Sequence, residues 1–102
     1  MEKNQFLNQI ISVAEKLSLG ILKFQEELYY LSNSNLNENE LKEIYEDIKY
    51  IVGVLTLELL AINNILDKIK KDEQFYSQNK NELNEFLLKV ERYCSKYDLT
   101  TE

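Results

Sequence analysis

The sequence predicts an all-α protein, an antiparallel bundle of three helices near residues 3–32, 38–72 and 80–98. The 102 residues include no Pro and only two Gly, while Leu, Ile, Glu, Lys, Asn and Tyr dominate. That composition suits long helices better than sheets with many reversals. Apolar residues also recur at alternating steps of three and four, the period of a helix seam. A chain of this length has room for one domain, which we assign to residues 1–102.

The first two predicted helices carry continuous apolar seams, which favours a long helical hairpin. In the first helix the seam consists of Leu7, Ile10, Ala14, Leu17, Ile21, Phe24, Leu28 and Leu31. In the second helix the same spacing selects Leu41, Tyr45, Ile48, Val52, Leu55, Leu59, Ile62, Leu66 and Ile69. Phe6 and Val13 lie on the flank of the first helix that we expect to face the third. The polar segment 32–37 connects the two long helices.

The third predicted helix is shorter and carries the ladder Leu83, Leu87, Val90, Cys94 and Tyr97. Asn37 and Asn79 each precede a helix and have a Glu three residues later, the spacing of a capping box. Both are therefore predicted N-caps. Segment 72–79 either forms a loop or continues the second helix, and with Phe75 and Tyr76 it could also fold as a fourth element over an exposed surface.

The net charge of −6 raises the question of nucleic-acid mimicry, which the placement of the charges makes the weaker interpretation. The second helix begins with an acidic cluster and ends with lysines; these residues are Glu38, Glu40, Glu43, Glu46, Asp47, Lys68, Lys70 and Lys71. This polarity compensates the helix dipole. The sequence leaves open whether the acidic start is also a binding surface. Its charge argues against direct nucleic-acid binding.

The residues that most catalytic and metal sites need are missing from the sequence. There is no His, the one cysteine is Cys94, and the two glycines stand apart, so we expect no enzymatic activity, no cofactor and no metal site. Cys94 occupies an inward position, which predicts a buried, unreactive thiol. The N-terminal residues do not resemble a signal peptide, and we expect a cytoplasmic protein. Residues 51–66 are shorter than the roughly 20 residues of a membrane-spanning helix and are better interpreted as a buried helix, without a membrane partner.

Glu58 is the only charged residue within 51–66. If the second and third helices turn near residues 75 and 76, Glu58 lies level with Arg92 and Tyr93. We therefore predict a partly buried pair that fixes the position of the third helix. The alternative is that Glu58 has no partner within the chain and receives a basic group from a bound protein.

The third helix is about half as long as the second, so it leaves the far half of the hairpin uncovered. Exposed apolar and tyrosine-rich surfaces mark protein interfaces. We predict partner-binding positions there and on the outward face of the second helix. They are Leu22, Tyr29, Tyr30, Ile44, Tyr50, Ile51, Val54, Leu57, Glu58 and Ala61.

These features predict a small, acidic, non-enzymatic protein that binds a protein target through helix faces. An inhibitor, an immunity-type protein or an adaptor of bacterial or phage origin fits this description; the resemblance to bacterial immunity proteins and phage-encoded inhibitors is one of size and helical content only. The alternative is a self-associating structural or assembly component. In that case a homodimer would complete the helical bundle.

Overall fold

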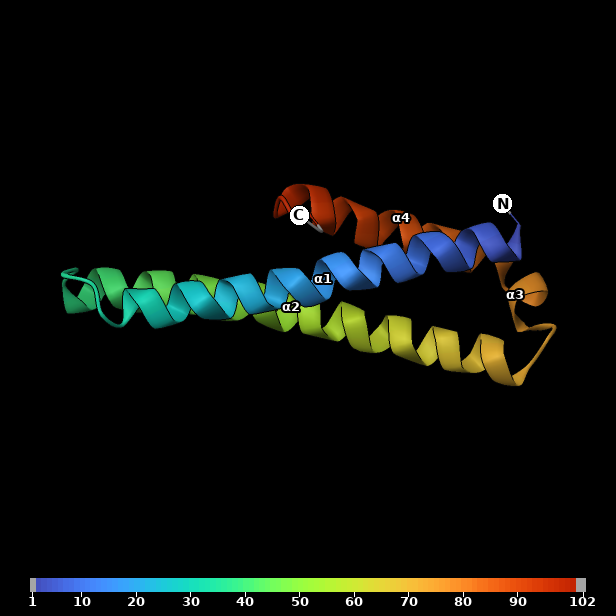
Figure 1. The fold of residues 1–102 in the computed structure, drawn as a ribbon, viewed down its shortest axis with the longest axis horizontal. Coiled ribbons are helices and arrows are strands. Elements are labelled where there is room, and N and C mark those ends of the chain that lie inside the picture. The colour runs from blue at the N-terminus through green and yellow to red at the C-terminus, as the bar shows by residue number, and fades with distance from the viewer. Residues whose placement is uncertain (1, 101–102) are drawn as a thin grey trace.

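The computed structural model describes residues 2–100, and within that range the chain is helical and contains no strand. Helices α1 (Lys3–Leu31) and α2 (Glu38–Lys71) form a long antiparallel pair. The short α3 (Phe75–Gln78) follows, and α4 (Lys80–Lys96) packs against α1 (Figure 1). The molecule is elongated, 54 × 22 × 20 Å. The three predicted helices are confirmed, each ending within two residues of its predicted limit.

The two predicted N-caps have different outcomes. Asn37 is extended, and its side-chain oxygen accepts a hydrogen bond of 2.9 Å from the backbone N–H of Glu40, which confirms this cap. Asn79 occupies the predicted N-cap position of α4, but the predicted capping hydrogen bond is absent: its side-chain amide instead donates to the carbonyl of Phe75 at 2.9 Å. Because α4 follows α3 without an extended residue, Asn79 lacks the backbone conformation that an N-cap requires.

The core side of α1 combines Ile10 and Leu17 of the predicted seam with Phe6 and Val13 of the flank predicted to face the third helix. The buried residues of that helix are Phe6, Ile10, Val13, Leu17 and Gly20. By contrast, Leu7, Ala14 and Ile21 of the predicted seam are only half-buried. This difference arises because α4 packs along α1 as well as α2 does, and the most enclosed positions face the centre of all three helices. Leu55, Ile62, Leu87 and Val90 meet there and are fully buried.

Segment 72–79 forms neither a plain loop nor a continuation of α2. Helix α2 ends at Lys71, and the carboxylate of Asp72 accepts a hydrogen bond from the backbone N–H of Gln74 at 2.9 Å. The turn then leads into α3, where Tyr76 is buried against Phe6 with ring centroids 5.2 Å apart. The fourth element therefore closes the end of the bundle and does not cover the outward face of α2.

The chain after α4 turns back onto α1. Asp98 has a left-handed backbone (φ 54°). The N–H of Leu99 donates a hydrogen bond to the carbonyl of Cys94 at 2.8 Å, and the N–H of Asp98 donates one to the carbonyl of Ser95 at 3.3 Å. These two bonds define a Schellman motif. Leu99 is buried, and a Cβ atom added to Gly20 would lie 2.5 Å from one of its methyl groups. Gly20 thus provides the space that Leu99 fills.

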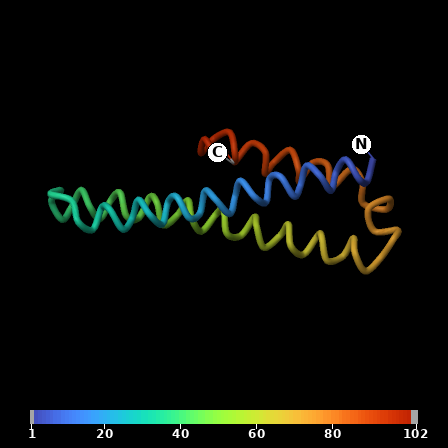
Figure 2. Tube along the Cα trace, viewed as in Figure 1, coloured from blue at the N-terminus to red at the C-terminus, as the bar shows by residue number. Residues whose placement is uncertain are grey.

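The α1–α2 hairpin extends well beyond the end of α4, as predicted (Figures 1 and 2). Tyr97, just after α4, packs edge-on against Phe24 with ring centroids 6.5 Å apart. Farther toward the tip of the hairpin, Ile48 is buried but does not belong to the main core cluster. The tip is therefore held by two helices only.

Candidate protein-binding surfaces

Helix α2 contains the most apolar part of the chain and is buried along one stripe only. Its buried residues are Ile48, Leu55, Ile62 and Ile69. By length and composition alone, an 18-residue window of this helix could cross a membrane, and 17% of that window is buried. Core helices of soluble proteins pass the same test, but those are mostly buried. The interpretation of residues 51–66 as a buried helix is therefore correct for one side of α2, while its other sides are open.

The outward face of α2 carries a second line of apolar side chains. Tyr50 and Leu57 are about two-thirds exposed (69% and 67%), while Val54 and Ala61 are half-buried. Successive steps of four, three and four residues place all four on one stripe of the helix, which we call the outer stripe. At 100° per residue, this stripe lies more than 90° around α2 from Leu55 and Ile62. It is therefore separate from the core.

The other predicted positions divide between two further regions. Ile44, Ile51 and Glu58 share the flank of α2 beside its seam; Ile44 and Ile51 are half-buried, and Ile51 packs against the core. On α1, Leu22 and Tyr29 lie seven residues apart on one stripe and are exposed by 57% and 68%.

Tyr30 points about 100° farther around α1, although its ring contacts that of Tyr29 at 5.8 Å. Tyr30 is 69% exposed. The ten predicted residues therefore do not form one continuous patch.

One apolar surface was missed by sequence reasoning. A groove of about 560 Å³ between α1 and α2, which we call the hairpin groove, is lined by Ile11, Ala14, Glu15, Ser18, Leu19, Leu59, Asn63 and Leu66. No residue of α4 lines it, and Ile11 and Leu19 are almost half exposed. Ile11 lies 11 residues from Leu22 and 18 from Tyr29, so all three lie on one side of α1. This spacing was the signal in the sequence that could have identified Ile11 as part of an exposed apolar surface.

Glu58 has a partner within the chain, but a different one from those predicted. Its carboxylate oxygen Oε1 lies 3.3 Å from the ammonium of Lys89, one helical turn before Arg92 and Tyr93. Arg92 is exposed. The pairing places α4 about one helical turn from its predicted position along α2. The Glu58 side chain is 13% exposed and that of Lys89 53%, so the pair is half open to solvent.

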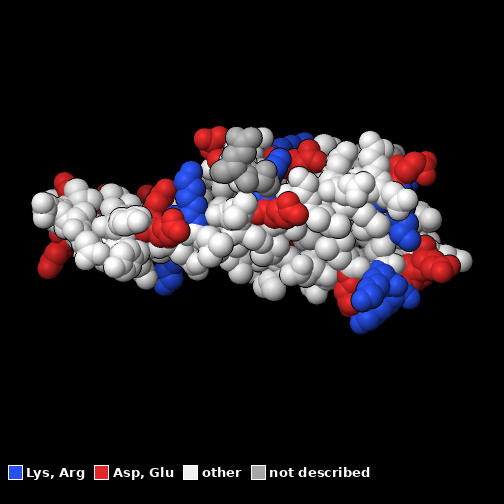
Figure 3. All heavy atoms as spheres, in the orientation of Figure 1, with Lys and Arg blue, Asp and Glu red and all other residues white. Residues whose placement is uncertain are grey.

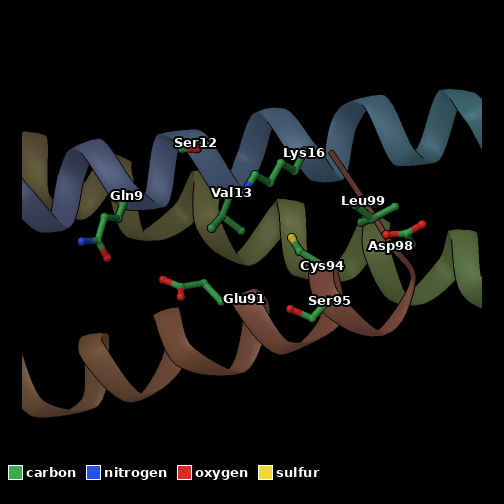
Figure 4. A pocket seen from close by; sticks show the side chains of 9 residues that line it. All are labelled: Gln9, Ser12, Val13, Lys16, Glu91, Cys94, Ser95, Asp98 and Leu99. Atoms are coloured by element: carbon green, nitrogen blue, oxygen red, sulfur yellow. The ribbon is translucent and has the colours of Figure 1, made fainter. Parts of the chain in front are cut away.

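A second cleft of about 560 Å³ lies between α1, α4 and the chain after α4 (Figure 4). Its polar lining includes Lys16, Glu91 and Asp98. Cys94 lies at its base and is buried. Burial raises the pKa of the Cys94 thiol above its usual value of 9.0; Lys16 opposes this shift and Glu91 adds to it. The burial of the thiol agrees with the prediction of an inward position.

Comparisons with protein-family models, curated proteins and solved structures found no match. Within residues 2–100, no group of three or more His, Cys, Asp or Glu side chains is placed to hold a metal ion. Figure 3 shows a broad area of uncharged residues along the hairpin, interrupted near its middle by a group of acidic atoms, and lysine atoms gathered near the end of α2. The function is therefore best inferred from the outer stripe and the hairpin groove.

Proposed function

We propose that this chain is a small, non-enzymatic protein that binds a protein target through apolar helix faces, as an inhibitor, an immunity-type protein or an adaptor does. One observation carries the proposal: large apolar side chains along the hairpin are exposed. Leu22, Tyr29, Tyr30, Tyr50 and Leu57 are each more than half exposed. Exposed apolar side chains that gather on one surface mark interaction sites, and Ile11 and Leu19 gather in this way in the hairpin groove, as Tyr50 and Leu57 do on the outer stripe.

The hairpin groove suits an amphipathic helix of the target. Its two walls are antiparallel helices, so a third helix laid along them would pack its apolar side chains between theirs. Leu59 and Leu66 of α2 lie seven residues apart and present two apolar contacts at successive heptads. Glu15 on the rim and the net charge of −6 favour a target helix with basic residues on its flanks.

The competing explanation for an apolar and open α2 is insertion into a membrane. Two observations weigh against it. Glu58 lies in the middle of the apolar segment, and a charged side chain at the centre of a bilayer costs about 2.5 to 3.5 kcal/mol. One side of α2 also packs against α1 and α4, so insertion would separate the core residues Leu55 and Ile62 from their neighbours.

Site-specific photo-crosslinking in cells of the source organism tests the proposal. We would place a photoreactive phenylalanine at Ile11 or Leu19 in the hairpin groove, and at exposed Asn81 on α4 as the matched control. We expect both groove positions to yield one common adduct with another protein and Asn81 to yield none. An Ile11→Glu substitution should abolish the adduct from Leu19 without changing helicity.

The proposal would be contradicted by adducts with lipid alone, or by the same adducts from Asn81 as from the groove. An adduct of twice the chain mass of 12.1 kDa would report self-association, which is a separate question.

A further inference from the structure

The outer stripe continues beyond its apolar centre toward both ends of α2 and changes character on the way. Continuing the steps of three and four residues from Tyr50 toward the N-terminus reaches Asp47 and Glu43. Continuing them from Ala61 toward the C-terminus reaches Asn64, Lys68 and Lys71, all exposed. One face of α2 is thus acidic at its start, apolar in its middle and basic at its end.

We propose that the outer stripe is the interface of an antiparallel homodimer, in which the α2 helices of two copies pack with Leu57 on the two-fold axis. This rests on the proposed function in one respect, namely that the exposed apolar side chains of α2 bind protein. About Leu57, Tyr50 of each copy lies level with Asn64 of the other, and Val54 lies within one residue of the level of Ala61. Helices with apolar residues at steps of three and four pack in this way, because each side chain enters a gap on the facing helix.

The charges on the stripe select a second copy as the occupant and determine its orientation. In the antiparallel alignment Glu43 lies level with Lys71 of the second copy, and Asp47 lies within one residue of the level of Lys68. By symmetry each pair occurs twice. A parallel alignment would place acids beside acids and lysines beside lysines. Opposite charges across an interface fix orientation and exclude other arrangements, even where each exposed pair contributes little.

The geometry of the free chain is compatible with this contact. The stripe from Glu43 to Lys71 is about 42 Å long at 1.5 Å per residue. Lys71 pairs with Asp67 at 2.9 Å, with both side chains more than half exposed. The ammonium of Lys68 lies 5.8 Å from the centre of the Phe75 ring. Exposed contacts of this kind can exchange for contacts with a second copy.

Gly53, next to the stripe, gives a second reason to expect a close neighbour. A glycine in the middle of a helix is destabilising, and Gly20 has a reason within the chain because Leu99 covers it. A Cβ atom added to Gly53 would meet nothing within 4 Å, so the packing of this chain does not require a glycine there. Close approach of a second α2 helix would require a glycine at this position.

Sedimentation equilibrium of the purified full chain over a wide concentration range tests the dimer. We expect wild type to be dimeric at high concentration and Leu57→Glu to be monomeric with unchanged circular dichroism. Leu88→Glu is the matched control, since Leu88 is 54% exposed on α4, and it should remain dimeric. In a Cys94→Ala background, Leu57→Cys should form an intermolecular disulfide readily, because the two-fold axis brings the two thiols together.

A charge-reversal experiment tests the orientation. Glu43→Lys with Asp47→Lys should weaken self-association, and so should Lys68→Glu with Lys71→Glu. Each variant alone places like charges at all four pairs, whereas mixing the two variants places opposite charges at all four pairs of a heterodimer, so heterodimers should form in preference to either homodimer. Combining all four reversals in one chain restores every pair and should recover the homodimer.

Three outcomes would overturn the proposal. These are a wild type that stays monomeric at every concentration, a Leu57→Glu variant that still dimerises, and binding of wild type, lost in Leu57→Glu, to phosphatidylcholine and phosphatidylglycerol vesicles. The two proposals fail separately. A monomer that still gives the adduct from Ile11 removes only the dimer, and a dimer without any adduct from the groove removes only the separate protein target.

Discussion

The ammonium of Lys89 on α4 lies 3.3 Å from the Glu58 carboxylate on α2 and joins the most apolar part of the hairpin to the third long helix. Glu58 is mostly enclosed, whereas Lys89 is half exposed. The second carboxylate oxygen of Glu58, Oε2, is buried and has no hydrogen-bond partner among the described residues. The pair therefore positions α4 on α2 more than it stabilises the fold, because a half-exposed ion pair is screened by solvent.

A double-mutant cycle in urea tests this pairing. We expect Glu58→Gln and Lys89→Ala to show a coupling free energy of about 0.2 to 1 kcal/mol, the range of pairs open to solvent. Glu58→Gln with Arg92→Ala is the control and should be additive, because Arg92 is exposed one turn farther along α4. Coupling to Arg92 and none to Lys89 would contradict the observed position of α4.

The two glycines should respond in opposite ways to alanine. Gly53→Ala should raise the free energy of unfolding by about 0.5 to 1 kcal/mol, because alanine favours helix and the added methyl enters open space. Gly20→Ala should gain nothing or lose stability, because Leu99 must move to admit the methyl. Both are best measured by urea unfolding in a Leu57→Glu background, where we expect no dimer. Equal gains would show that Leu99 does not rest on Gly20.

Asp98 should be improved by glycine. An L-residue in the left-handed conformation costs roughly 1 to 2 kcal/mol, an amount that Asp reduces through local hydrogen bonds and that glycine avoids. We expect Asp98→Gly to stabilise the chain by up to about 1 kcal/mol in urea unfolding. Asp98→Ala provides the comparison and should not stabilise. No difference between the two variants would argue against the left-handed turn after α4.

The buried thiol of Cys94 predicts a loss of stability in alkali. Burial raises its pKa in the folded chain above the usual value of 9.0. Well below pH 9 the thiol is protonated in both states, and its ionisation contributes nothing to the pH dependence of stability. Above it the unfolded chain releases a proton that the folded chain retains, so unfolding becomes easier.

We therefore expect the difference in free energy of unfolding between wild type and Cys94→Ala to stay constant below pH 8. Above pH 9 the free energy of unfolding of wild type should fall relative to that of the variant. Urea unfolding at a series of pH values measures it. A difference independent of pH up to the folded pKa would indicate an exposed thiol.

The sequence predicts the long helices well because local features specify them. Apolar periodicity locates α1, α2 and α4, and the Asn37 cap locates the start of α2 within one residue. The flank with Phe6 and Val13 also indicated which side of α1 faces α4, and both residues are buried. Local features do not show how deeply each seam residue is enclosed once three helices pack, so Leu7, Ala14 and Ile21 are only half-buried, and the hairpin groove with Ile11 and Leu19 was missed.

The end of the bundle was also beyond prediction from spacing alone. At this end α3 buries Tyr76, and α4 lies about one helical turn from its predicted position along α2, which changes the partner of Glu58 from Arg92 or Tyr93 to Lys89. The burial of Leu99 depends on a left-handed turn at Asp98. Such a turn is usually marked by a glycine, and the sequence has none at this position. The exposed positions Leu22, Tyr29, Tyr50 and Leu57 were identified because apolar residues outside a seam are visible in the sequence.

The central claim is that the exposed apolar side chains of the hairpin serve binding and are not needed for folding. Urea unfolding of a Leu22→Ser and Leu57→Ser double variant, at a concentration where wild type is monomeric, tests it most directly. We expect each substitution to change the free energy of unfolding by no more than about 0.5 kcal/mol, whereas Leu55→Ala in the core should cost about 2 to 5 kcal/mol. A double variant as unstable as Leu55→Ala would show that these side chains belong to the fold, and would contradict the claim.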